Sequence, residues 1–238
     1  FESRDGLMLK GWFVPSQNGA AVVCAHGFRE NRLGSVLVAR MLVEEGYGVL
    51  VFDLRGHGES EGNLSTGGWA EIDDLLGAVD FVCHKKHINP KRLGVFGFSL
   101  GGQIALRAAA QDKRIAAVTT DGASAAVLYD HTYAHRLQMS RQWLWNLIAY
   151  RVQRVLTGVA PPQEGVMQSM ERIGPRAVLL IAAGGRNERN CNREFFRRAK
   201  EPRELWVVPE ARHGRVIEER PEEYQETVLD FFDFNLLG

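Results

Sequence analysis

Short apolar runs alternate along the chain with longer segments of helical periodicity. Each run has four to six residues and is apolar almost throughout, as in strands of a sheet covered on both faces. The runs span residues 20–25, 47–52, 93–96, 115–120, 177–182 and 205–208. Between them, apolar positions return about every three to four residues, which predicts helices that lie against the sheet. These helices are expected at residues 37–45, 66–82, 101–108, 163–172, 192–200 and 221–237. The pattern predicts an α/β fold, with a mostly parallel central sheet and helices on both faces.

Residues 127–161 break this alternation. The segment is rich in aromatic side chains and has helical spacing through Leu144, Ile148, Val152 and Val155. Trp143 and Trp145 are only two positions apart, so one helix cannot easily bury both on the same face. This favours a small helical cap or lid over a further pair of packed helices.

The length and composition indicate one domain, residues 1–238, with the cap as an insertion. Residues 1–14 are expected to form a hairpin around the turn signal Asp5-Gly6. Twenty-nine Lys and Arg residues balance 29 Asp and Glu, so nothing in the charge favours a nucleic acid partner. No apolar run is long enough to span a membrane.

Cysteine usage and the first residues bear on the compartment. The three cysteines lie far apart without a CxxC pair, so we expect no disulfide framework. The chain begins at Phe1 in strand-like sequence, and an upstream signal or anchor is compatible with that start. The localisation is therefore left open, with a slight preference for the cytoplasm.

The most informative stretch is Gly97-Phe98-Ser99-Leu100-Gly101, which follows the apolar run 93–96. Its Gly-x-Ser-x-Gly spacing is that of a nucleophile elbow, in which a strand turns sharply into a helix. Such a corner leaves no room for side chains two positions on either side of the serine. It also places the hydroxyl beside a helix N-terminus, which favours developing negative charge.

With this elbow the chain resembles the α/β-hydrolase family, and three further stretches match in order: residues 26–27, 53–60 and 211–214. The resemblance covers nearly the whole chain and implies serine hydrolase chemistry on a mostly parallel sheet. It also places residues 127–161 where the family commonly inserts a lid. For the oxyanion hole it implies the backbone N–H groups of Phe28 and Leu100.

A serine nucleophile needs a base, and a histidine base needs a carboxylate to orient it. His213 follows the run 205–208 by a short loop, as the family's histidine does. The family's register places the acid at Asn187, which carries no charge, so the chain departs from the pattern there. We expect Glu188, one residue further on, to be the acid. Asp121, at the end of an earlier strand, is the reserve.

The other histidines are expected to be structural. His26 and His57 lie in loops that match structural signatures of the family. His131 and His135 are four residues apart, but a third ligand at metal spacing is missing, so no metal site is expected. No cofactor is expected either, since Gly97-Phe98-Ser99 lacks the second glycine of a dinucleotide-binding loop.

These residues predict a carboxylesterase that cleaves small-molecule esters with short to medium acyl groups through an acyl-enzyme. Peptidase, thioesterase and acyltransferase activity remain open, because all of them share the elbow. A binding protein whose triad has decayed at Asn187 is the alternative from another class.

Overall fold

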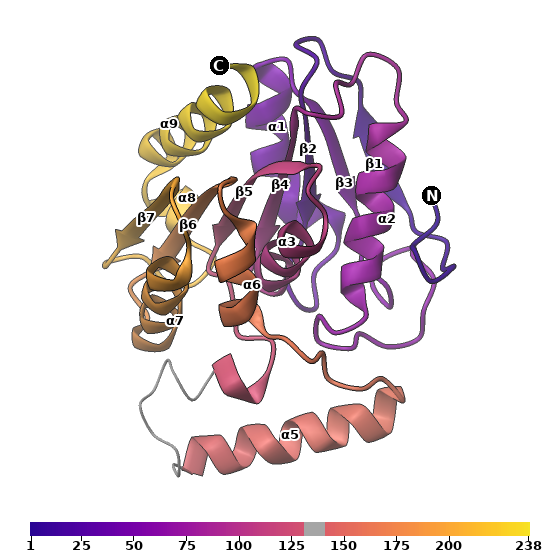
Figure 1. Ribbon diagram of the computed structural model, residues 1–238, viewed down its shortest axis with the longest axis vertical. Helices are drawn as coiled ribbons and strands as arrows, with labels where there is room; N and C mark the ends of the chain where they lie inside the picture. The colour runs from indigo at the N-terminus through magenta and orange to yellow at the C-terminus, as the bar shows by residue number, and fades with distance from the viewer. Residues whose placement is uncertain (131–140) are drawn as a thin grey trace.

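The computed structural model describes residues 1–130 and 141–238, except for the side chains of residues 141–143 (Figure 1). The described residues form a seven-stranded sheet in the order β1-β3-β2-β4-β5-β6-β7. β1 is antiparallel to β3 and every other pair is parallel. The strands are β1 (Gly11–Val14), β2 (Ala21–Ala25), β3 (Gly48–Phe52), β4 (Leu93–Phe98), β5 (Ile115–Asp121), β6 (Ala177–Ala183) and β7 (Arg203–Val208).

Helices cover both faces of this sheet. The helices that follow the strands are α1 (Val36–Glu44), α2 (Glu71–Cys83), α3 (Leu100–Gln111), α6 (Val166–Ile173), α7 (Arg186–Arg198) and α9 (Pro221–Phe232). Shorter or separate elements are η1 (Arg32–Ser35), α5 (Arg141–Thr157), α8 (Val216–Glu219) and η2 (Asp233–Leu237). Helices α1 and α9 pack on one face, and α2, α3, α6 and α7 on the other (Figure 1).

The two faces explain why the central strands are apolar throughout. Along β2, Val23 belongs to the core under α2 and α3, whereas Val22 and Cys24 belong to the core under α1 and α9. Successive side chains of a strand point to opposite faces, so a strand covered on both sides needs an apolar residue at every position. The predicted α/β fold with a mostly parallel sheet is confirmed.

Three element boundaries differ from the predictions. The expected N-terminal hairpin is reduced to one bridge between Glu2 and Met8, and β1 pairs with β3 instead. Helix α2 begins at Glu71, because the Glu71 carboxylate accepts the N–H groups of Thr66 and Gly68 and holds residues 66–70 as a turn. Helix α7 begins at Arg186, six residues earlier than expected.

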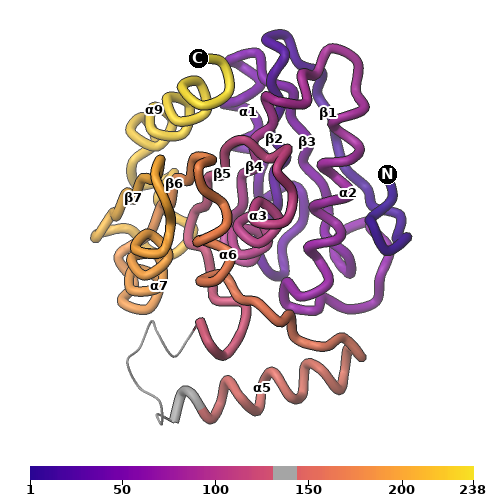
Figure 2. The backbone as a smooth tube through the Cα atoms, in the orientation of Figure 1, coloured from indigo at the N-terminus to yellow at the C-terminus, as the bar shows by residue number. Residues whose placement is uncertain are grey.

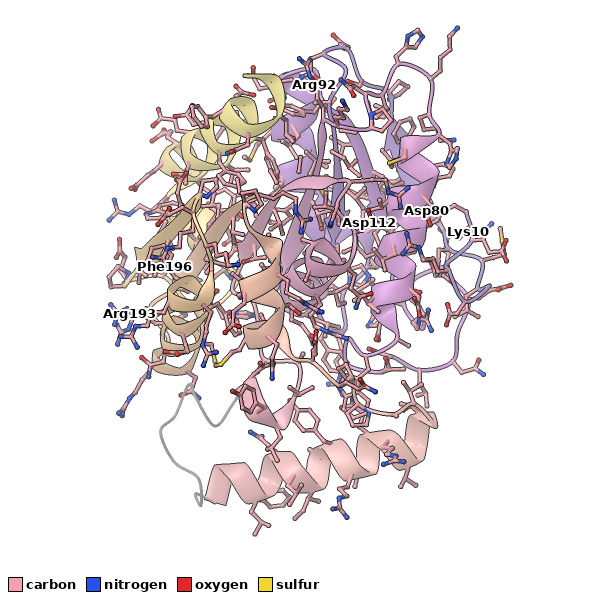
Figure 3. The ribbon with its side chains drawn as sticks, in the orientation of Figure 1. Lys10, Asp80, Arg92, Asp112, Arg193 and Phe196 are labelled. Carbon is pink, nitrogen blue, oxygen red and sulfur yellow. The ribbon has the colours of Figure 1, made fainter. Side chains whose placement is uncertain are left out.

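An ion-pair cluster fastens the N-terminal segment to the helices. Arg4 contacts Asp80 of α2 at 2.9 Å and Asp112, just after α3, at 3.0 Å. Arg114 contacts the same two carboxylates. Figure 3 shows Asp80 and Asp112 on the same side of the molecule, and the cluster lowers the pKa of both. These contacts hold the ends of α2 and α3 together, away from the loops that follow the strands.

Helix α5 lies apart from the two helical layers. It runs along one end of the molecule, opposite the end that carries the C-terminus (Figure 2). The carboxyl ends of the parallel strands point toward this end, because residues that follow β4 and β5 line one cavity together with Asn146 of α5. In the described ranges, no helix is long and apolar enough to cross a bilayer.

Candidate active site

Five segments meet where the parallel strands end. They follow β2, β4, β5, β6 and β7, and they carry Phe28, Ser99, Gly122, Glu188 and His213 respectively, with Glu188 in the first turn of α7. In sequence order the chain first adds β3 beside β2 and then β4 on the other side, so the strand order reverses between β2 and β4. The carboxyl edge next to such a reversal is where α/β sheets bind ligands.

The turn between β4 and α3 is strained at its corner residue. Ser99 has a φ of 50°, which is in the left-handed region that non-glycine residues rarely adopt. A side chain on Gly97 would collide with the backbone of Gly101, and one on Gly101 would collide with the carbonyl of Ala25. The two glycines therefore let the elbow close and let α3 begin against the end of β2.

A chain of hydrogen bonds joins Ser99, His213 and Glu188. The Nε2 atom of His213 lies 3.0 Å from Ser99 Oγ, and its Nδ1 lies 2.7 Å from Glu188 Oε2. A neutral ring that donates from Nδ1 to the carboxylate leaves Nε2 free to accept the serine proton. The other oxygen of Glu188 accepts the N–H of Ala183 at 2.6 Å, so the end of β6 fixes the carboxylate.

The electrostatics of this chain favour a histidine that takes up a proton. The hydrogen bond that His213 donates to Glu188 raises the pKa of His213 above its usual value, against the opposing effect of partial burial. Cys191 also lines the cavity beside Ser99, but burial raises the pKa of its thiol to about 12. The thiol is therefore protonated at neutral pH and does not compete as a nucleophile.

Asp121, the alternative acid, faces another partner. Its side chain is buried at the end of β5 and accepts a hydrogen bond of 3.1 Å from the hydroxyl of Tyr224 in α9. Burial raises the pKa of Asp121 to about 7, despite this hydrogen bond. The carboxylate in contact with the Nδ1 atom of His213 belongs to Glu188.

Two residues that the sequence did not single out shape the histidine's position. A Cβ on Gly122 would lie 2.8 Å from both Cε1 and Nδ1 of His213, so only glycine leaves room for the ring. Phe98 stacks on the imidazole, with ring centroids 5.3 Å apart and planes 29° apart. Phe98 is the first variable position of the elbow motif, and its role depends on a loop more than a hundred positions away.

The two amides expected to form an oxyanion hole lie on adjoining turns. Leu100 is the first residue of α3, where N–H groups have no carbonyl of a preceding turn to bond with. Phe28 follows the turn at Gly27, whose N–H donates to Glu30 at 3.0 Å. A Cβ on Gly27 would meet the Phe98 ring at 2.8 Å, so this turn lies directly against the elbow.

His26 and His57 are both engaged with the backbone. His26 is buried; its Nδ1–H donates to the carbonyl of Gly27 at 2.7 Å, and its Nε2 accepts the N–H of Leu54 at 3.0 Å. Burial lowers the pKa of His26 to about 4. His57 lies between the carbonyl of Arg55 at 2.9 Å and the N–H of Arg29 at 3.3 Å. These contacts tie the Phe28 turn to the loop after β3.

A cavity of about 320 Å³ opens in front of Ser99. Residues 122–125, three residues of α7, His213 and Asn146 of α5 line it. From the sequence, the tryptophans of residues 127–161 predict an apolar wall beside Ser99. Trp145 instead is 66% exposed, and the neighbouring Asn146 faces the cavity. The side chain of Trp143 lies outside the described residues, as do His131 and His135.

Polar contacts hold the cap segment against the body. The buried carboxylate of Asp130 accepts the N–H groups of residues 126 and 127, where the segment begins, and of residues 166 and 167, where α6 starts. Gln153 of α5 donates to the carbonyl of Thr66. The rings of Tyr150 and Trp69 lie 5.7 Å apart. The turn at residues 66–70, which α5 contacts, is in turn fixed to α3. Gln103 donates to the carbonyl of Gly67 at 2.9 Å, and Arg107 donates to the carbonyl of Gly68 at 2.6 Å.

The fold and this site define a hydrolase of the α/β class. The chain belongs to the alpha/beta hydrolase fold family, whose profile matches residues 20–171. The protein YfhR of Escherichia coli (strain K12) is 29% identical over 242 residues, which cover 97% of this chain and 78% of that protein.

Two further relatives have activities in their names. A thiohydrolase of Aspergillus aculeatus, aneE, is 30% identical over 196 residues, or 79% of this chain and 59% of that protein. The structure of an esterase from Pyrococcus furiosus superposes with a TM-score of 0.77 at 28% identity, and the match covers 99% of this chain and 90% of the esterase. Among the residues described here, no group of three His, Cys, Asp or Glu side chains is placed to hold a metal ion.

Proposed function

We propose that the protein is a serine carboxylesterase, with Ser99 as nucleophile, His213 as base and Glu188 as acid. The observation that carries the proposal is the hydrogen-bonded chain from Ser99 Oγ through both nitrogens of His213 to Glu188. A serine hydroxyl is a weak nucleophile until an adjacent base removes its proton. An oriented histidine within hydrogen-bond distance supplies that base.

In the proposed reaction, Ser99 Oγ attacks the ester carbonyl while His213 Nε2 takes the serine proton. Glu188 stabilises the resulting imidazolium through its hydrogen bond to Nδ1. The N–H groups of Phe28 and Leu100 stabilise the oxyanion, and His213 then returns the proton to the leaving alkoxide. Water, activated by the same histidine, cleaves the acyl-enzyme and restores Ser99.

The relatives and the cavity support the ester class and the size of the acyl group. The Pyrococcus furiosus protein that matches nearly the whole chain is an esterase. A cavity of about 320 Å³ lies at the low end of small-molecule sites, which suits short to medium acyl groups. We also assign residues 127–161 to a cap on this cavity, since Asn146 contributes to its wall.

Thioester cleavage is the second candidate, because a thiohydrolase is among the relatives. The same three residues serve both reactions, since only the leaving atom differs. Matched acyl groups presented as an ethyl ester and as an N-acetylcysteamine thioester separate the two. A clear preference in kcat/KM for the thioester would replace the carboxylesterase assignment and leave the serine mechanism standing.

Ser99→Ala tests the mechanism. With p-nitrophenyl esters of graded acyl length, kcat is expected to fall on the order of a millionfold, because the nucleophile is lost. Ser124→Ala is the matched control: it removes a hydroxyl from the wall of the same cavity, and kcat should stay within about tenfold of wild type. Equal activity of Ser99→Ala and wild type, in purified folded protein, would exclude a serine hydrolase.

A further inference from the structure

The outer face of α5 is apolar and exposed. Between residues 144 and 156, six large apolar side chains are each between 45% and 81% exposed. They are Leu144, Trp145, Ile148, Val152, Val155 and Leu156. Their spacing places them on one side of a helix, so they form a continuous stripe. A soluble helix normally turns such a stripe toward the core.

The opposite face of α5 points inward and carries the polar groups of Asn146, Tyr150 and Gln153. Asn146 lines the cavity, Gln153 donates to the carbonyl of Thr66, and Tyr150 lies beside Trp69. These contacts fix the rotation of the helix about its axis, so the apolar stripe faces away from the protein. Helix α5 also forms the outer edge of the molecule, with no other element of the described chain beyond it (Figure 1). The stripe is therefore accessible along its length.

The charge of α5 has one sign. Residues 141–157 include three arginines and no aspartate or glutamate. Arg151 and Arg154 are exposed beside the stripe. Two copies of α5 packed face to face would bring these arginines together without a carboxylate from either helix to neutralise them. The charge thus favours an anionic partner over a second copy of the chain.

We propose that the outer face of α5 docks on an anionic lipid surface. A helix with arginines and an apolar stripe that contains tryptophan lies in the interfacial plane, with the apolar side chains among the lipids and the guanidinium groups near anionic headgroups. Such docking needs no membrane-spanning segment. It would bring the cavity that Asn146 lines to within one helix diameter of the lipid. The docking stands independently of the proposed esterase activity.

Vesicle flotation tests the proposal without any activity measurement. The full chain is mixed with vesicles of pure phosphatidylcholine, or of equal parts phosphatidylcholine and phosphatidylglycerol. We expect binding to the anionic vesicles and binding at least about tenfold weaker to the neutral ones, since each basic residue at an anionic surface strengthens binding several-fold. Equal binding to both, or binding to neither, would overturn the proposal.

Matched variants locate the contact. Ile148→Gln with Val155→Gln should lower the partition coefficient about tenfold or more by removing apolar contact from the stripe. Arg151→Gln with Arg154→Gln should lower it about twenty-fold. The apolar control is Leu37→Gln with Phe234→Gln, at exposed positions on α1 and η2. The charge control is Lys91→Gln with Lys113→Gln, at the amino ends of β4 and β5.

Circular dichroism confirms that each variant is folded, and both control pairs should bind as wild type does. Controls that weaken binding as much as the α5 variants would overturn the assignment to α5. Analytical ultracentrifugation measures whether a second copy of the chain occupies the stripe instead. A dimer that Ile148→Gln with Val155→Gln dissociates, together with no vesicle binding, would show that the stripe pairs with a second copy.

Discussion

Helices α5 and α9 differ in the side that they turn toward the rest of the protein: α9 turns its apolar side inward, and α5 turns its apolar side outward. In α9, the side chains against the sheet are apolar and include Val228 and Phe232, while Glu222, Glu223, Glu226 and Asp230 face solvent. In α5, the described contacts with the body are made by Asn146, Tyr150 and Gln153, which all carry polar groups, and six large apolar side chains face solvent beside arginines. Helix α9 is held by burial of apolar surface, and α5 by individual polar contacts.

The difference indicates what each helix contributes. Removing apolar surface from water is the dominant favourable term in folding, so α9 stabilises the sheet. A helix whose apolar side stays in water adds little to that term. Helix α5 instead contributes Asn146 to the cavity wall on one side and exposes its apolar side chains on the other. The packed region therefore carries the stability, and in our proposals it also carries the chemistry, while residues 127–161 control access and α5 docks on lipid.

After the loss expected for Ser99→Ala, the next largest effect tests whether the chemistry belongs to the packed region. Glu188→Gln keeps the shape of the acid in the first turn of α7 and removes its charge. The amide no longer stabilises the imidazolium, and kcat should fall about ten-thousandfold, as for the same type of change in another triad enzyme. Because the hydrogen bond that His213 donates to Glu188 raises the pKa of His213, the acidic limb of the residual activity should move to lower pH in the variant.

Asp121→Asn is the comparison for that variant, with kcat expected within about tenfold of wild type. The reverse ranking of the two variants would transfer the acid to Asp121. Near-full activity of both would mean that some other group orients His213. Asn187→Asp added to Glu188→Gln tests the family's register: recovery of activity would show that a carboxylate at position 187 can reach the histidine.

A pair of identical substitutions tests the comparison of the two helices directly. Val228 of α9 is 0% exposed and Val155 of α5 is 81% exposed. Val228→Ala should lower the free energy of unfolding by about 2–3 kcal/mol, through lost burial and the cavity left behind. Val155→Ala should change it by less than about 0.5 kcal/mol, since alanine is also the better helix former. Urea denaturation measures both, and equal losses would mean that α5 belongs to the core.

The same contrast shows how far the sequence predicted the fold. The order of strands and helices followed from apolar runs such as 20–25, because a two-sided strand must be apolar at each position. Periodicity in α5 likewise predicted a helix with two faces. It did not predict which face points inward, because that depends on partners such as Thr66 and Trp69, which are remote in sequence.

The site divides in the same way. The elbow around Ser99 was predictable because its signal is a five-residue motif, although the backbone that excludes a side chain at Gly101 belongs to Ala25, which is remote in sequence. The start of α7 was not, since its first five residues are all polar and carry no apolar periodicity. Gly122 was missed because the side chain that fills its space, His213, belongs to a distant loop. The roles of Ser99, His213 and Glu188 in catalysis stay predictions until the variants are measured.

A smaller effect concerns the carboxyl group buried under α9. Burial raises the pKa of Asp121 to about 7, whereas in the unfolded chain it lies near 4. The folded state thus keeps a proton that the unfolded state loses as pH rises from about 4 to 7, and stability decreases over that range. Asp121→Asn removes this dependence and should raise Tm relative to wild type by a few degrees at pH 8, on the order of 2 kcal/mol. At pH 4 the two proteins should melt together, and a difference there as large as at pH 8 would contradict the assignment.

The smallest expected effect is a change in acyl-length selectivity, and it compares two adjacent residues on different faces of α5. Asn146 faces the cavity, whereas Trp145 is largely exposed. Asn146→Ala removes a polar group from the wall, and the kcat/KM ratio of octanoate to butyrate p-nitrophenyl esters should rise about three- to tenfold, the usual value of a small change in an apolar subsite. Trp145→Ala, although it removes far more volume, should leave the ratio unchanged, because its ring lies on the other face of the helix. If Trp145→Ala shifts the ratio and Asn146→Ala does not, α5 is rotated relative to the orientation described here, and the contrast with α9 no longer holds.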